Sequence, residues 1–171
     1  MKKCLNEWNA TVEALGQGRQ TILIRKYGTT VENFLLYPTA SYAFKNDFLR
    51  SFEIEYKAFA SANLIPKKED GKTEIKYYAE VEDVVEKSSK MIGTLNKYHI
   101  WTKEHLESYL NNKKAKIWIL RVYKLKEPVM VQTNGGTRYA NLKNEVPIAG
   151  MKPVLKDEMF SSLKKEIECM N

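Results

Sequence analysis

Apolar residues recur every three or four positions in several stretches of the chain, the spacing that places them on one face of an α-helix. The first stretch contains Leu5, Trp8, Val12 and Leu15. We predict helices over residues 4–15, 84–95 and 154–170 on this basis. A shorter helix is predicted over residues 103–110, because Thr102 is a favourable N-cap residue. Residues 41–49 are also compatible with a helix.

Other segments alternate apolar and polar residues or are rich in β-branched and aromatic residues, as half-buried strands are. Strands are predicted over residues 21–25, 31–37, 52–59, 74–81 and 116–125, with a continuation at 128–131. Helices and strands are mixed without regular alternation, which argues against a doubly wound parallel sheet. We therefore predict a single α+β domain over residues 1–171, with a curved mixed or barrel-like sheet decorated by helices.

The chain is basic, with 28 Lys and Arg residues against 21 Asp and Glu residues and a net charge of +7. This balance favours polyanionic partners such as nucleic acid. Basic residues are dense between positions 113 and 126, where they interleave with Trp118 and Tyr123. Such interleaving suits phosphates and stacked bases, although a strand with an ordinary solvated basic face has the same pattern.

The sequence indicates a cytoplasmic protein with no membrane partner. No run approaches the ~20 apolar residues that a membrane helix needs, and the basic start is not followed by the apolar segment of a signal peptide. Cys4 and Cys169 are the only cysteines, and we expect both to be reduced thiols.

One segment has the residue order of a restriction-type nuclease. Such enzymes place Glu-x-Lys on a strand after an upstream acidic residue, so that two carboxylates hold Mg²⁺ and the lysine steadies the attacking hydroxide. Glu55 and Lys57 have this spacing, and Asp47 is a candidate for the upstream acid. The wet face of an ordinary strand gives the same pattern, so both interpretations stand.

Signatures of other enzymes are absent from the sequence. It contains no phosphate-binding GxxxxGK[ST] loop, no GxGxxG fingerprint and no GxSxG elbow. His99 and His105 are the only histidines, and they are not spaced i, i+4 on one helix as zinc ligands of the HExxH type are. We predict no metal site and no cofactor, with Mg²⁺ required only if the nuclease interpretation holds.

Several blocks resemble a bacterial family known only as domain of unknown function eighteen-oh-two. The blocks are Glu7-Trp8, Glu13-Ala14-Leu15, Gly18-x-Gln20, Leu23-Ile24-Arg25-Lys26-x-Gly28, Phe34-Leu35-Leu36-Tyr37-Pro38-Thr39, His99-Ile100-Trp101-Thr102 and Leu120-Arg121-Val122-Tyr123-Lys124-Leu125 with Pro128. The family usually carries His where Tyr42 stands and a Cys-Lys-Ser-Trp-like block in its tail, from which the chain after Arg138 differs. The family name implies no activity.

A more distant resemblance is to ASCH and EVE domains of the PUA-like superfamily. Gly18 and Arg25 match the outer positions of the ASCH motif Gly-x-Lys-x-x-Glu-x-Arg, while Gln20 and Leu23 replace its inner residues. The run from Leu125 to Val129 is also similar to a late strand of these domains. The resemblance implies a small PUA-like pseudo-barrel that binds RNA or flipped, often modified, bases.

We accordingly expect a nucleic-acid-binding domain and, more narrowly, a PUA-like reader of an RNA base or a modified DNA base. The expected ligand-binding residues are Arg25, Lys26, Tyr37, Thr39, His99, Trp101, Thr102, Arg121 and Tyr123, with phosphate contacts from Lys116 and Lys124. Trp118 lies on the opposite strand face from Arg121 and Tyr123, so we expect it in the core. The alternatives are the Mg²⁺-dependent nuclease and a protein-interaction module of a bacterial defence or toxin–antitoxin system.

Overall fold

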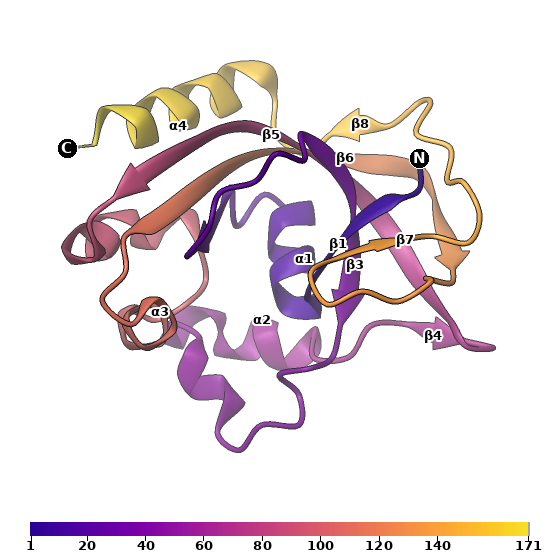
Figure 1. Cartoon of the computed structure of the whole chain (residues 1–171), viewed down its shortest axis with the longest axis horizontal. Coiled ribbons are helices and arrows are strands. Elements are labelled where there is room, and N and C mark those ends of the chain that lie inside the picture. The colour runs from indigo at the N-terminus through magenta and orange to yellow at the C-terminus, as the bar shows by residue number, and fades with distance from the viewer. Residues whose placement is uncertain (171) are drawn as a thin grey trace.

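The computed structural model describes residues 1–170 and is built around one curved mixed sheet (Figure 1). Its strands are β1 (Lys3–Trp8), β2 (Ile22–Arg25), β3 (Asn33–Thr39), β4 (Lys68–Glu69), β5 (Lys72–Lys87), β6 (Ala115–Val131), β7 (Tyr139–Asn141) and β8 (Lys152–Pro153). The α-helices are α1 (Asn9–Gly16), α2 (Lys57–Ala62), α3 (Lys103–Leu110) and α4 (Asp157–Cys169). Three 3₁₀ helices are η1 (Phe48–Ser51), η2 (Ile54–Tyr56) and η3 (Ser89–Tyr98).

The sheet has the order β2-β6-β5-β3-β1-β7, with β4 paired to β5 and β8 paired to β6. The long strands β5 and β6 are antiparallel along most of their length, and register irregularities interrupt the pairing twice. Strands β1 and β3 are parallel, so the sheet is mixed. Irregularities of this kind bend a strand and raise its twist, which is consistent with a sheet that curves around α1 (Figure 1).

The two faces of the sheet bury different side chains because residues alternate along each strand. Within β3, Phe34 and Leu36 belong to the larger apolar cluster inside the curve, while Leu35 belongs to a smaller cluster on the other face. The larger cluster includes Trp118 and most apolar residues of α1. Because α1 is enclosed, nearly all of its residues are buried, including the polar Glu13.

The remaining helices lie around the sheet and α1: α4 runs along the outside of the sheet next to β5, and α2 and α3 lie on the open side of its curve (Figure 1). Helix α4 places Phe160 and Ile167 against the larger cluster, and Arg121 on β6 forms an ion pair with Asp157 in the first turn of α4. Helix α3 begins after Thr102, whose hydroxyl accepts the backbone N–H of His105 at 3.2 Å. The cap and bounds of α3 agree with the sequence-based prediction.

The α+β class with a curved mixed sheet is confirmed, but several predicted elements are wrong. Residues 4–15 are not one helix, because strand β1 precedes α1 and pairs with β3 and β7. Residues 52–59 do not form a strand but η2 and the start of α2, and Ile54 is 80% exposed rather than buried. Strand β5 extends to Lys87, so the predicted helix over 84–95 is replaced by a strand end and η3. Residues 41–49 contain turns and the start of η1.

None of the helices in residues 1–170 is long and apolar enough to span a membrane. Both cysteines are free thiols: Cys4 is buried in the smaller cluster, and Cys169 is exposed. Burial raises the pKa of the Cys4 thiol to about 11, although its hydrogen bond to the Ala140 carbonyl acts in the opposite direction.

Candidate nucleic-acid interface

A pocket of about 610 Å³ opens where the ends of β1, β2 and β3 meet helix α3. Its size lies within the range of about 300–1,000 Å³ that is usual for small-molecule sites. The lining comes from segments far apart in the sequence: Asn6, Glu7, Trp8, Ile24, Arg25, Tyr27, Thr39, Ser41, Lys45, Trp101, His105, Leu106, Ser108, Tyr109 and Thr137. The pocket therefore depends on the sheet topology, which brings these segments together.

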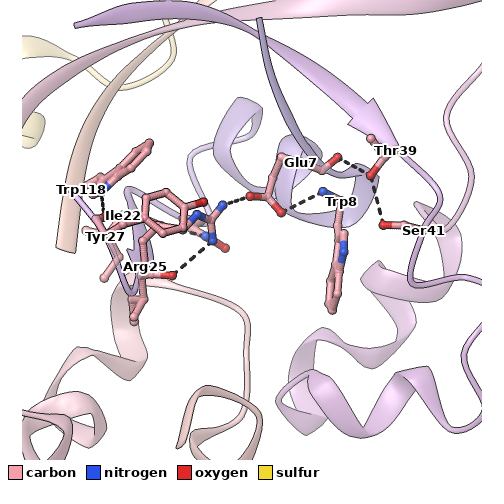
Figure 2. Close-up of polar contacts among 10 residues, drawn as sticks. Glu7, Trp8, Ile22, Arg25, Tyr27, Thr39, Ser41 and Trp118 are labelled. Carbon is pink, nitrogen blue, oxygen red and sulfur yellow. Dashed lines mark hydrogen bonds and ion pairs between the residues drawn. The ribbon is translucent and has the colours of Figure 1, made fainter. Parts of the chain in front are cut away.

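Glu7 and Arg25 form an ion pair in the pocket lining, with only 7% and 12% of their side chains exposed. Figure 2 shows the Glu7 carboxylate between Trp8 and the Arg25 guanidinium. The second Glu7 oxygen accepts the backbone N–H of Trp8 at 2.8 Å. Burial opposes the charge on Arg25, but the Glu7 carboxylate, together with Tyr27 and Tyr109, offsets this and holds the pKa of Arg25 above its usual value. Arg25 therefore stays charged, and the Glu7 carboxylate is its counter-charge.

Aromatic rings form much of the pocket lining. Trp8 is partly exposed and stacks on Tyr42, with ring centroids 4.6 Å apart. Tyr42 is itself buried, and its hydroxyl donates to the carbonyl of Asn63 and accepts the N–H of Ala10. The Trp8 ring is therefore held from behind by a fixed side chain, while its own surface contributes to the pocket.

On the other side of Glu7, Tyr27 lies beside Arg25 (Figure 2). Its ring meets Trp118 edge to face at 5.8 Å, and the indole N–H of Trp118 donates to the Tyr27 carbonyl at 3.0 Å. Trp118 is fully buried, as expected from its strand face. Tyr109 on α3 completes this side of the lining. Trp8, Tyr27 and Tyr109 are each partly exposed, so parts of three aromatic rings remain accessible.

The histidines near the pocket are held neutral. Burial lowers the pKa of His105, which lines the pocket, and the positive charge of Lys45 lowers it further. His99 lies behind Trp101, fully buried, and its Nδ1 accepts the Trp101 backbone N–H at 3.2 Å. Burial lowers the pKa of His99 to about 4. Neither imidazole therefore adds positive charge to the pocket at neutral pH.

The pocket brings together part of the predicted ligand-binding set. Arg25, Thr39 and Trp101 line it. Lys26 lies next to the lining, with its ammonium 4.9 Å from the ring centroid of Tyr109. The Thr102 hydroxyl accepts the N–H of His105 as the cap of α3 and donates to the carbonyl of Arg50. It therefore has hydrogen-bond partners within the protein both as acceptor and as donor.

The other predicted contacts lie elsewhere. Arg121 is only 4% exposed beneath α4, with its guanidinium 4.8 Å from the Phe160 ring. Tyr123 donates to Glu80 at 3.1 Å, and Tyr37 donates to Thr73 at 2.9 Å. Two further predicted residues are on β6: Lys116 is paired with Glu86 at 2.6 Å, and Lys124 is exposed. None of these residues lines the pocket.

The structural premise of the nuclease alternative is wrong. Glu55 belongs to η2 and Lys57 begins α2, so the two residues do not project from one strand face. Asp47 lies in a left-handed turn and pairs with Arg50 at 3.7 Å. Among residues 1–170, no three acidic, histidine or cysteine side chains gather in a way that could hold a metal ion.

Sequence reasoning missed four of the residues that define the pocket: Glu7, Trp8, Tyr27 and Tyr109. Glu7 and Trp8 were assigned to a helix, where they would not meet Arg25 on β2. The adjacent Glu7-Trp8 block was the only signal for them, because it is among the blocks that resemble a known family. Tyr27 occupies only the unspecified position of one block and Tyr109 lies outside the blocks, so their place in the pocket follows only from the tertiary structure.

The fold and the pocket together define a class: an α+β protein whose curved sheet ends in an aromatic pocket with a buried ion pair. The chain belongs to the family described as Domain of unknown function (DUF1802), which it matches over residues 4–166. The sequence resemblance to this family is thereby confirmed, and the match extends through the tail beyond Arg138. No curated protein matches the chain by sequence.

Solved structures similar to the chain include the ASCH protein from Zymomonas mobilis, with 12% sequence identity and a TM-score of 0.45. That comparison covers 95% of this chain and 93% of the other. Two variants of the same Zymomonas mobilis protein, a tyrosine-to-phenylalanine and a serine-to-alanine substitution, also have TM-scores of 0.45. Their identities are 11% and 12%, with 95% and 96% of this chain and 96% and 94% of the other chains covered.

Proposed function

We propose that this protein is a nucleic-acid-binding domain that takes one unpaired base into the pocket between the sheet and α3. The observation that carries the proposal is a pocket of about 610 Å³ with aromatic walls and a buried, internally neutralised ion pair. The basic charge of the whole chain supports a polyanionic partner. The strand that supplies the base is RNA or DNA, and in DNA the base is a modified one.

The aromatic lining suits the flat face of a nucleobase. Unstacked bases of single strands are recognised by stacking on aromatic side chains, which contributes about 1–3 kcal/mol per base. Trp8 and Tyr109 offer partly exposed rings, and Trp8 is held in place by Tyr42. A base enters such a site only when it is unpaired or extruded from a duplex.

The polar lining offers hydrogen bonds in both directions. The Glu7 carboxylate has only acceptors, and the Arg25 guanidinium has only donors. The Thr39 hydroxyl donates to the backbone carbonyl of Glu7 at 3.1 Å, and the Ser41 hydroxyl lies 3.4 Å from the Thr39 hydroxyl (Figure 2). The edge of a nucleobase carries both donors and acceptors, so this lining is complementary to it.

The charge of the pocket favours the base over the phosphate as the inserted group. The Glu7 and Arg25 charges cancel, and burial keeps His105 neutral at pH 7. A phosphate placed beside the ion pair would lie against the Glu7 carboxylate and lose hydration, while the other cation of the lining, Lys45, is exposed to solvent. A neutral heterocycle has no such cost, so the base is the part of a nucleotide that fits.

A steric block tests the proposal without disturbing the core. Ser108 is an exposed α3 residue in the pocket lining, and Ser108→Trp should fill part of the pocket. We expect at least a tenfold loss of affinity for a labelled single strand of about twelve nucleotides, measured by fluorescence anisotropy with RNA and with DNA. Ser161→Trp is the matched control, because Ser161 is an exposed residue of α4, which contributes nothing to the pocket. Equal affinities of the Ser108→Trp variant and the unmodified protein would contradict the proposal.

A further inference from the structure

Three cations surround the pocket, and each lies over an aromatic ring of its lining. The Lys45 ammonium is 5.6 Å from the ring centroid of Trp8, and the Lys26 ammonium is 4.9 Å from that of Tyr109. The Arg138 guanidinium carbon is 3.3 Å from the ring centroid of Tyr27. All three rings line the pocket. Lys45 lies with Trp8 on one side of Glu7, whereas Lys26 and Arg138 lie with Tyr109 and Tyr27 on the other side.

These cations are exposed and free of counter-charges. Among residues 1–170, no carboxylate lies within 4.0 Å of the ammonium or guanidinium group of Lys26, Lys45 or Arg138. All three residues are exposed. Each therefore has at least one face open to solvent and to an anion, while the aromatic ring supports its other face through a cation–π contact.

The dense basic segment at positions 113–126 does not line the pocket, and only some of its cations, such as Lys113, Lys124 and Lys126, are exposed and unpaired within residues 1–170. Lys114 and Lys116 both pair with Glu86 at 2.6 Å, and Arg121 is buried against α4. Part of the charge between positions 113 and 126 is therefore already neutralised within the protein. The free cations next to the aromatic pocket are instead Lys26, Lys45 and Arg138, which form its rim although they are scattered in the sequence.

We infer that Lys26, Lys45 and Arg138 form a track for the phosphates on both sides of the inserted base, so that the partner is a single strand and not a free nucleotide. This inference rests on the proposed function, since the base must occupy the pocket for its flanking phosphates to lie at the rim. A neutral interior surrounded by three cations matches a nucleotide with its base inside and its backbone outside. A free nucleotide has one such position, whereas a strand has phosphates on both sides of each internal base.

An exposed ring next to the rim supports a strand as the partner. Phe44 precedes Lys45 and is 82% exposed, the largest exposure among the bulky apolar residues described. Proteins that bind single strands combine cations that follow the backbone with aromatic rings on which successive bases stack. Because Phe44 is adjacent to Lys45 in the chain, we assign to it the stacking of a base that neighbours the inserted one.

The test compares two triple variants with equal loss of charge. The rim variant carries Lys26→Gln, Lys45→Gln and Arg138→Gln. The control variant changes three exposed lysines that form no ion pair within residues 1–170, on elements that contribute nothing to the pocket: Lys68→Gln in β4, Lys152→Gln in β8 and Lys165→Gln in α4. The probe is a labelled single-stranded RNA of about twelve nucleotides, titrated over a fourfold range of salt concentration.

Each phosphate contact adds about 0.7 to the magnitude of the slope of log K against log salt concentration for a single strand. Because three contacts are lost, the slope of the rim variant should be smaller in magnitude by about 2. Over the fourfold range of salt concentration, the affinity of the rim variant should therefore fall by a factor roughly 20 times smaller than the affinity of the unmodified protein does. It should also bind the RNA at least tenfold more weakly than the control variant at low salt. Binding of a labelled mononucleotide should be much weaker than binding of the strand, and the rim substitutions should weaken it less, because it has a phosphate on one side of the base only.

Equal slopes and affinities of the two triple variants would overturn the inference. If Ser108→Trp still weakened binding in that case, the proposed base pocket would stand and only the phosphate track would be wrong. If the rim variant lost affinity and slope while Ser108→Trp had no effect, the strand would follow the rim without inserting a base, and the proposed function would be wrong. No binding by the unmodified protein at low salt would overturn both.

Discussion

The ion pair between Glu7 and Arg25 gives a quantitative test of the pocket's electrostatics. Glu7→Gln removes the negative charge but retains an amide oxygen that can accept the Trp8 backbone N–H. The Arg25 charge then remains largely buried without its partner, since its side chain is only 12% exposed. Breaking a buried pair by removing one partner costs about 3–5 kcal/mol. Because both side chains keep slight exposure, we expect the lower value, about 3 kcal/mol, for Glu7→Gln.

A double-mutant cycle separates the pair from other effects of the substitutions. Arg25→Met should cost a similar amount, while the double variant should be less destabilised than the sum of the two by about 2 kcal/mol. The free energy of unfolding is measured by urea denaturation at pH 7. The control cycle uses Lys103 and Glu107, an exposed pair at 3.6 Å on α3, for which coupling of no more than about 0.5 kcal/mol is expected. A Glu7–Arg25 coupling no larger than the control would refute an internally neutralised pocket.

Two further predictions concern titratable groups. Burial lowers the pKa of His99 from 6.5 to about 4. The His99 imidazole therefore binds a proton more readily in the unfolded chain than in the folded one. The associated stability is complete above pH 6.5 and falls by about 3 kcal/mol as the pH drops to 4. His99→Gln should remove this part of the pH dependence in urea denaturation at a series of pH values, and an unchanged profile would refute the assignment. Because Cys4 is buried with its pKa raised to about 11, a thiol reagent at pH 8 should modify Cys169 quickly and Cys4 only on unfolding. Rapid reaction of both thiols in the native protein, measured by mass spectrometry, would contradict the structure.

Elements specified by local signals were predictable from the sequence. Helix α3 occupies Lys103–Leu110 as predicted, because a threonine N-cap and the following periodic residues lie within one segment. The core of β6 was also predictable, since its β-branched and aromatic residues continue through the sheet. In both cases the residues that determine the element are close together in the chain.

Elements fixed by distant partners were not predictable in this way. Strand β1 pairs with β3 and with β7, which is more than a hundred residues later in the chain. Leu5 and Trp8 have the spacing of a helix in the sequence, but this pairing places them in a strand. Strand β1 ends at Trp8, and the helix starts only at Asn9. The alternation at 52–59 was misleading in the opposite direction, because Phe52 is buried while Ile54 is 80% exposed.

The candidate site depends on the same long-range pairing. Arg25 was predictable from the basic end of its strand, but its partner Glu7 meets it only after β1 joins the sheet. Of the free cations at the pocket, Lys26 was predicted but Lys45 and Arg138 were not, because counter-charges such as Glu86 and Asp157 are assigned to particular basic residues by the fold. Clustering of lysines in the sequence therefore does not show which of them are paired: Lys114 and Lys116 share Glu86, whereas Lys113, Lys124 and Lys126 are exposed and form no ion pair within residues 1–170.

The most direct test of base insertion compares strands with the same number of phosphates. One strand carries a single base within a run of abasic residues, and the other is entirely abasic and of equal length. Stacking contributes about 1–3 kcal/mol per base, so the protein should bind the strand with one base roughly 5- to 150-fold more tightly. Ser108→Trp should abolish this difference while leaving the affinity for the abasic strand unchanged. Equal affinities of the unmodified protein for the two strands would contradict insertion of a base into the pocket.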